Sequence, residues 1–206
     1  MIPPELRPAF EEGHRVETPG GVGRTRRRRL ANLVLPSGHV TIGCPGVYAD
    51  QAPCHIPLSV LPGNYPVFIT LAVHNGGRAT TAFVTVHFAP AEAVMWEVAG
   101  SFFTDHGDGV IYDASLAEFL RQKKEAMSLE QWQALKASAL QDGDGNLILD
   151  ETTGANAIVF RACDWIYRCH VGRDGDGRAS CLLIDGRVHR SHTDGIAAWF
   201  RRLCRR

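Results

Sequence analysis

The sequence lacks long apolar stretches and an excess of charge of either sign. No segment approaches the roughly 20 consecutive apolar residues that a membrane-spanning helix requires, and the first residues lack the charged stretch and apolar run of a secretion signal. Lysine plus arginine equals aspartate plus glutamate, at 22 each, so no net field attracts the chain to nucleic acid or anionic membranes. We therefore expect a cytoplasmic protein that does not bind a membrane.

The sequence also lacks the motifs of several common enzyme classes. It contains no Gly-x-Ser-x-Gly nucleophile elbow, no phosphate-binding P-loop and no dinucleotide-binding fingerprint after a strand. Its six cysteines do not form the closely spaced ligand pairs of structural zinc sites. Segment 142–146 begins like a calcium-binding EF-hand, but Leu147 and Thr153 stand where that loop needs glycine and glutamate. We predict that this segment is a turn that ends a helix.

The first 29 residues differ from the rest of the chain. They contain four prolines, several glycines and the basic run Arg24 to Arg29, without a regular apolar period. Proline and glycine weaken regular elements, so we predict a flexible arm over residues 1–29 and a single domain over residues 30–206. The arginines suit phosphate binding, but no aromatic stacking platform accompanies them. We favour a solvated arm, and we expect no nucleic-acid partner apart from one attracted by the Arg24–Arg29 arm.

After residue 30, alternating apolar residues and turn signals predict a series of strands. Strands joined by short turns are expected to pair antiparallel. Glycine-rich turns at 75–77 and 173–177 predict two hairpins, and the turn at 36–38 predicts another. The predicted strands are 32–35, 39–42, 67–74, 78–88, 93–99, 157–160, 165–171 and 179–184.

Helical periodicity interrupts the strands once and returns at the end. Apolar residues three and four positions apart predict a helix over 115–127. Ser128 and Gln131 form a capping-box pattern that starts a second helix, which ends near 142–143. A third helix is predicted from Ile196 to about Leu203. The predicted class is α+β, mostly antiparallel β with an inserted helical hairpin and a C-terminal helix.

Four stretches, in this order, carry a resemblance to a known family. They are residues 35–40 with 43–45, residues 61–67 running to 95–97, residues 104–109 with 112–113, and residues 163–167 with the hairpin to 184–185. Together they resemble the domain of unknown function 4241 family of bacterial proteins, over roughly residues 30–186. The family supplies no reaction, so the resemblance implies a fold and an origin but not an activity.

The chain departs from the family pattern in two places. Cys44 stands where the family usually has an aspartate, within Gly43-Cys44-Pro45. Asp164 lies within Cys163-Asp164-Trp165, where the family usually has Gly-Asp-Gly. If those family positions carry chemistry, the resemblance implies that this member has lost or altered it.

The best candidate site in the sequence is an acidic, glycine-rich loop. Asp105, His106 and Asp108 lie close together, and Asp113 follows within a few residues. Such groups can hold a hard cation through oxygen ligands, with Asp105 and Asp113 as the predicted ligands, or act as a general acid and base. The alternative, which we favour, is a tight turn whose aspartates bond their own backbone, with Asp113 capping the next helix.

Asp164 adds to this candidate site if it reaches the same pocket. A carboxylate beside aromatic residues is costly to bury without a partner, so Asp164 is paired, exposed or part of a site. The enzyme would be built from Asp105, His106, Asp108, Asp113 and Asp164. Its base would be His106, because the ordinary pKa of histidine lies nearest neutrality.

Two functions from different classes remain open. The first is a binding or accessory protein that takes a protein partner or a small molecule. The second is a small hydrolase-like enzyme, metal-assisted or acid/base, that uses the Asp/His cluster with a divalent cation. The enzyme requires the Asp105 loop and Asp164 to line one pocket.

Overall fold

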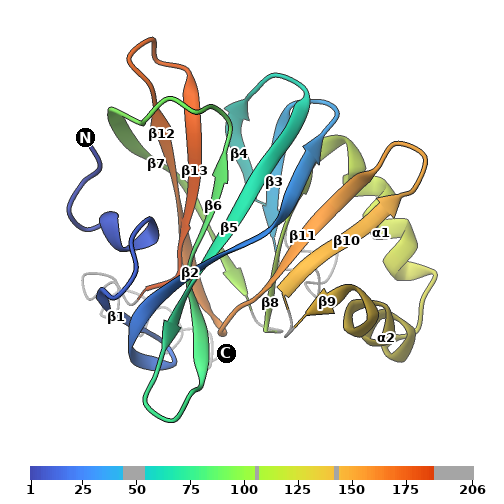
Figure 1. Cartoon of the computed structure of the whole chain (residues 1–206). Coiled ribbons are helices and arrows are strands. Elements are labelled where there is room, and N and C mark those ends of the chain that lie inside the picture. The colour runs from blue at the N-terminus through green and yellow to red at the C-terminus, as the bar shows by residue number, and fades with distance from the viewer. Residues whose placement is uncertain (44–53, 105–106, 142–143, 188–206) are drawn as a thin grey trace, which may run out of the picture.

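The computed structural model describes residues 1–43, 54–104, 107–141 and 144–187, and these form two antiparallel β-sheets (Figure 1). Sheet A has seven strands in the order β1-β2-β5-β6-β13-β12-β7. Its strands are β1 (Arg15–Thr18), β2 (Gly21–Leu35), β5 (Gly63–Val73), β6 (Ala79–His87), β7 (Met95–Thr104), β12 (Trp165–Arg173) and β13 (Ala179–Asp185).

Sheet B has six strands in the order β4-β3-β8-β11-β10-β9. Its strands are β3 (His39–Gly43), β4 (Cys54–Ser59), β8 (Asp108–Asp113), β9 (Leu140–Gln141), β10 (Asp144–Asp150) and β11 (Ala155–Arg161). The predicted β-rich, mainly antiparallel class is therefore confirmed. No helix in the described part of the chain is long and apolar enough to cross a membrane.

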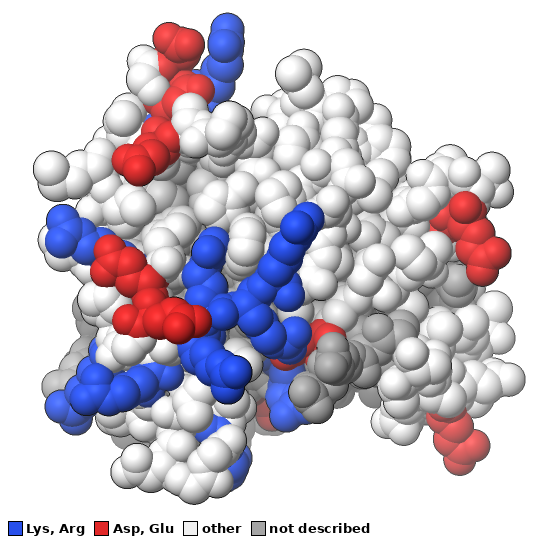
Figure 2. Space-filling view, viewed as in Figure 1, with Lys and Arg blue, Asp and Glu red and all other residues white. Residues whose placement is uncertain are grey.

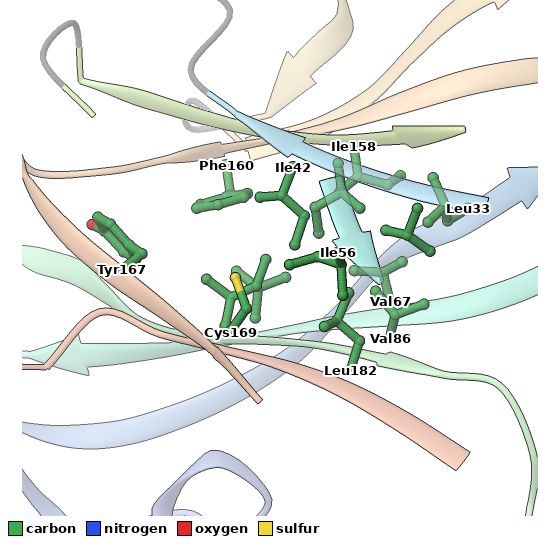
Figure 3. Close-up of a cluster of buried hydrophobic side chains, with 14 of the residues drawn as sticks. Leu33, Ile42, Ile56, Val67, Val86, Ile158, Phe160, Tyr167, Cys169 and Leu182 are labelled. Atoms are coloured by element: carbon green, nitrogen blue, oxygen red, sulfur yellow. The ribbon is translucent and has the colours of Figure 1, made fainter. Parts of the chain in front are cut away.

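The main hydrophobic core lies between the two sheets (Figure 3). Ile158 and Phe160 of β11 point toward sheet A, where they meet residues such as Val67 and Leu182. Ala157 and Val159, between and beside them in sequence, belong to a second cluster on the other face of sheet B. This division follows the period of two in a strand, so sheet B is apolar on both faces.

Two short helices cover the outer face of sheet B (Figure 1). A 3₁₀ turn, η2 (Ala114–Leu116), leads into α1 (Ala117–Glu125), and α2 (Leu129–Ala139) follows. Leu120 and Trp132 are the buried helical residues of this cluster. The two helices thus lie within the predicted ranges, but α2 ends at Ala139 and strands β9 and β10 follow it. The predicted helix-ending turn over 142–146 is therefore wrong for its described residues, 144–146, which begin β10. The pairing of the two helices as a hairpin stays a prediction, and the predicted C-terminal helix lies outside the described residues.

The N-terminal segment, defined here as residues 1–14, covers the outer face of sheet A. It contains the 3₁₀ turn η1 (Arg7–Ala9). Leu6 and Ala9 are 2% and 0% exposed and pack with Ala72, Phe83 and Leu183 in a third hydrophobic cluster. From one outer surface to the other, the molecule therefore has the order N-terminal segment, sheet A, sheet B, helices.

This arrangement corrects the expectation of a flexible arm over residues 1–29. The structure shows β1 in residues 15–18, and it shows β2 running without a break from Gly21 to Leu35. The arginine run does not prevent a strand, because successive side chains point to opposite faces. Long arginine side chains can reach solvent or a partner from either face. No boundary therefore falls at residue 30.

The turn at 36–38 also differs from its prediction. The strands before and after it, β2 and β3, do not pair with each other but belong to different sheets. Gly38 has φ of +73°, and a Cβ there would collide with the Val60 carbonyl oxygen. The turn is therefore a corner that carries the chain from sheet A to sheet B.

Candidate functional site

The alternation of β2 divides the arginine run between the two faces of sheet A. Arg28 lies opposite Ile69 of β5 on the inner face, and its Nη2 lies 2.8 Å from Oδ2 of the buried Asp144. Arg27 lies opposite Thr70, which bonds the carbonyl of Ala9 in the N-terminal segment. Arg27 therefore belongs to the outer face. Figure 2 shows the basic side chains gathered along the course of β2.

The Arg27 guanidinium is held by an aromatic ring and a histidine. Its Cζ lies 3.9 Å from the centroid of the Phe68 ring, on β5. Its Nη2 lies 3.2 Å from Nε2 of His87, the last residue of β6. A guanidinium only donates hydrogen bonds, so His87 Nε2 accepts and the imidazole is neutral with its proton on Nδ1. Burial, and then the charge of Arg27, lower the pKa of His87 below its ordinary value.

The Arg27 side chain has no carboxylate partner among the residues that the structure describes. Glu12 accepts a hydrogen bond from the backbone amide of Arg27, at 3.0 Å, and not from its guanidinium. The Nε of Arg27 is buried without a hydrogen-bond partner. Burial lowers the pKa of Arg27, and the nearby Cys181 opposes this in part, but an arginine stays charged at neutral pH. The site thus holds a half-buried positive charge that no described carboxylate neutralises.

A second unpartnered donor comes from β7. The Nε1 of Trp96 is buried and has no hydrogen-bond partner. The indole lies over β12, where a Cβ at Gly172 would be 3.0 Å from two of its ring carbons. Phe10 of the N-terminal segment contacts both Trp96 and His87, with ring centroids 5.9 Å and 6.0 Å apart. The N-terminal segment therefore completes the aromatic environment of this site.

These residues line a pocket of about 690 Å³, which we call the outer-face pocket. It lies between the N-terminal segment and strands β2, β5, β6, β7 and β13, with the β6–β7 connection on one side. Its apolar and aromatic walls include Ile2, Phe10, Tyr65, Pro66, Phe68, Phe88, Pro90, Ala93 and Trp96. The volume lies within the roughly 300–1,000 Å³ of small-molecule sites, which are likewise mostly apolar with a few polar groups.

The described lining of the outer-face pocket does not pair a nucleophile with a base. Burial raises the pKa of the Cys181 thiol to about 12, so the reactive thiolate is absent at neutral pH. Ser180 Oγ donates to the carbonyl of Gly172 at 3.3 Å, and His87 Nε2 is engaged by Arg27. None of these three described groups is therefore placed as an activated nucleophile or a free general base.

The described acidic residues of the predicted site, Asp108, Asp113 and Asp164, do not line this pocket. Asp105 and His106 fall outside the described residues. Asp108 begins β8 opposite Arg161 of β11, and the amide of Ala162 donates to the carbonyl of Gly107 at 2.8 Å. The strand end that carries Asp108 thus lies beside the segment that leads to Asp164, which is exposed. A shared site for these residues stays a prediction.

Asp113 is fully buried at the opposite end of β8. Its carboxylate accepts bonds from the amide and hydroxyl of Ser37, at 2.8 and 2.7 Å, and from those of Ser115, at 2.8 and 2.6 Å. Burial alone would raise its pKa, but these bonds hold the pKa below the ordinary value. Asp113 thus caps η2, as the favoured alternative predicts, and fixes the corner between the sheets.

The metal prediction for Asp105 and Asp113 gains no support from the described residues. Among them, no group of three or more His, Cys, Asp or Glu side chains could hold one ion. The Asp113 oxygens are already engaged by serine donors, and a cation would have to displace these bonds.

Sequence reasoning missed the residues that make the outer-face pocket. The arginine run is predicted as a solvated arm, whereas the structure places it in strand β2. An alternating strand through 24–29 would have placed Arg27 and Arg28 on opposite faces, and Thr25 within the run is a strand-favouring residue. The pairing of Arg27 with His87 spans 60 residues, and no local pattern signals it.

Comparison with known proteins identifies no relative. No family model matches the chain, no curated protein matches it, and no solved structure matches its fold. The resemblance to the domain of unknown function 4241 family therefore stays a prediction. The function must be argued from the geometry of the site.

Proposed function

We propose that this protein is a binding protein and that its ligand is a small molecule with a ring-containing apolar body, held in the outer-face pocket. One observation carries the proposal. Aromatic and apolar side chains from the N-terminal segment and from sheet A line an open pocket of about 690 Å³, and the half-buried guanidinium of Arg27 in its lining has no described carboxylate partner. A half-buried charge without a partner costs free energy, and a ligand group that pairs with the Arg27 guanidinium would relieve that cost.

The architecture supports a preformed site. Phe68, His87 and Trp96 project from three strands of one sheet, and strands hold side chains more rigidly than loops do. Phe10 of the N-terminal segment contacts His87 and Trp96 from the outer side of the sheet. A rigid pocket loses little conformational entropy on binding, which favours affinity for a small ligand.

A panel of naphthalene compounds tests this function in the intact protein. We expect at least one of 2-naphthoate, 2-naphthalenemethanol and 2-naphthylmethylammonium to raise the melting temperature and to give a saturable heat of binding. A ligand that binds only the folded state stabilises it by about 2.7 kcal/mol at 100 times its dissociation constant.

Paired variants locate the binding. Ala91 is exposed and lines the pocket, so Ala91→Trp should obstruct it and abolish binding. Ala134 is exposed on α2, on the far side of sheet B, so Ala134→Trp should leave binding unchanged. Equal binding by both variants would refute the pocket as the site.

A second candidate function rests on one contact. The Gly107–Ala162 hydrogen bond supports the proximity of Asp108 and Asp164, which the acid/base or metal-assisted enzyme requires. We keep that enzyme as the alternative, with Asp105 and His106 completing its site. Thermal melts with Mg²⁺, Ca²⁺, Mn²⁺ and Zn²⁺ test the metal-assisted form, because a bound cation raises the melting temperature. An Asp105→Asn variant should lose that rise, because Asp105 is a predicted ligand.

A further inference from the structure

We propose that the ligand of the outer-face pocket is an organic anion, a carboxylate on a flat apolar ring system, and that Arg27 is its counter-ion. The inference rests on the proposed function and specifies the chemistry of its ligand.

The first argument is the uncompensated charge. Arg27 is half-buried, and its guanidinium contacts the neutral His87 and the face of Phe68 but no carboxylate in the described part of the chain. Partly buried charges are normally paired, since burial without a partner is costly. Arg28, the next residue, follows this rule through its ion pair with Asp144. An anionic ligand would supply for Arg27 the partner that Arg28 already has.

The second argument is the excess of donors in the lining. The charged Arg27 guanidinium only donates hydrogen bonds, and His87 carries its proton on Nδ1 because its Nε2 accepts from Arg27. The described lining contains one carboxylate, that of Glu92, which is exposed. A ligand rich in acceptor oxygens fits these groups, and a cation does not.

The third argument is shape. A carboxylate is planar and matches the planar guanidinium through parallel hydrogen bonds. The guanidinium lies over the Phe68 ring, 3.9 Å from its centroid, so Arg27 keeps this orientation without a ligand. Phe10 and Trp96 meet at an interplanar angle of 61°, which leaves aromatic edges and faces to pack against a ring. The carboxylate of the ligand would thus lie at Arg27, and its ring would pack against Phe10 and Trp96 in the same pocket.

Isothermal titration with three isosteric probes of different charge tests the inference. We expect the wild-type protein to bind 2-naphthoate about tenfold or more tightly than 2-naphthalenemethanol, because a charge-assisted pair is stronger than a neutral hydrogen bond. 2-Naphthylmethylammonium should bind most weakly. Arg27→Met should bind 2-naphthoate and 2-naphthalenemethanol with about equal affinity. Arg27→Lys should retain part of the preference for 2-naphthoate.

Arg26→Met is the matched control. Arg26 is exposed and lies on the other face of the same strand, so its removal changes the net charge equally and should leave the preference unchanged. Equal affinity of the wild-type protein for the anion and the alcohol would overturn the inference and leave the binding function standing. An equal loss in Arg26→Met would also overturn it, and no binding by any probe would overturn both. The wild-type comparison decides the matter even if Arg27→Met does not fold.

Discussion

At the residue scale, a few buried polar side chains make the contacts that join distant strands. Asn156 of β11 accepts from the amide of Val34 at 2.8 Å and donates to the carbonyl of Asn32 at 2.7 Å, so one side chain joins β2 to sheet B. Asp113 performs a similar role at the corner between the sheets. His87 differs, because its main polar partner is a cation. These three environments give different responses to mutation and to pH.

His87 predicts a loss of stability in mild acid. Its pKa in the folded protein lies below the ordinary value of 6.5, so the unfolded chain binds the proton more readily. The free energy of unfolding should therefore fall as pH drops below about 6.5. His87→Gln should flatten this dependence in urea titrations between about pH 7.5 and about pH 5.5. The exposed His39 supplies the control, His39→Gln. Identical pH profiles for His87→Gln and the wild type would contradict this account.

Asp113→Asn should destabilise the protein by about 1–3 kcal/mol, because an amide cannot accept all the bonds that the carboxylate receives. The effect should be largest near neutral pH. The lowered pKa of Asp113 gives stability that is present above its ordinary value and is lost as pH falls through the folded value. Denaturant unfolding measures it, with Asp176→Asn in an exposed turn as the control. A loss no greater than that of the control would show that the corner does not depend on Asp113.

At the scale of elements, β2 is the central connection. It is 15 residues long, pairs with β1 and β5 in sheet A, and contacts β11 of sheet B through Asn156. The strand accommodates its arginines because alternate side chains point to opposite faces. Arg28 reaches Asp144 from the inner face, and Arg27 reaches the outer-face pocket. Strand β2, which the sequence predicts least clearly, is thus the element that joins the two sheets.

Arg28→Met tests the inner-face ion pair. Burial already raises the pKa of Asp144, and the charge of Arg28 opposes that rise. Without Arg28 the buried carboxylate keeps its hydrogen bond from the Arg161 amide but loses its ion pair, and we expect a loss of about 1–3 kcal/mol at neutral pH. The loss should shrink in acid, because a carboxyl with a raised pKa favours folding when protonated and opposes it as pH rises. Arg26→Met is the exposed control, and an equal loss in both variants would be inconsistent with the pair.

Leu6→Ala tests the N-terminal segment as a structural element. Leu6 is 2% exposed and packs on sheet A, so its truncation should cost about 2–4 kcal/mol. If residues 1–14 formed a flexible arm instead, Leu6→Ala would leave the stability unchanged. Thermal unfolding measures the effect, with Leu61→Ala as the control because Leu61 is 81% exposed. Limited proteolysis should also leave β2 uncut in the wild type.

The sequence predicts local elements well and their assembly poorly. The capping box is confirmed, with the Ser128 amide 2.8 Å from Gln131 Oε1, and the two glycine hairpins that join β5 to β6 and β12 to β13 are confirmed. Each depends on residues close in sequence. The corner at Gly38 and the contact of Arg27 with His87 depend on distant strands, so no local pattern could reveal them.

At the scale of the whole molecule, both outer faces of the paired sheets are covered. The helices bury apolar residues on sheet B, and the N-terminal segment does so on sheet A. The two covers differ in what they enclose. The helical side is packed around Trp132, whereas the N-terminal side encloses the outer-face pocket beside Trp96. The helix-covered face is therefore structural, and the face under the N-terminal segment is the proposed ligand-binding face.

The indole N–H signals of the four tryptophans test this assignment most directly. In a ¹H–¹⁵N spectrum of the intact protein, we expect 2-naphthoate to shift the Trp96 signal, identified by its absence in Trp96→Phe. The signal of Trp132, buried beneath the opposite face, should stay in place. A Trp96 signal that does not move at saturating 2-naphthoate, or that moves no more than the Trp132 signal, would contradict the outer-face pocket as the binding site.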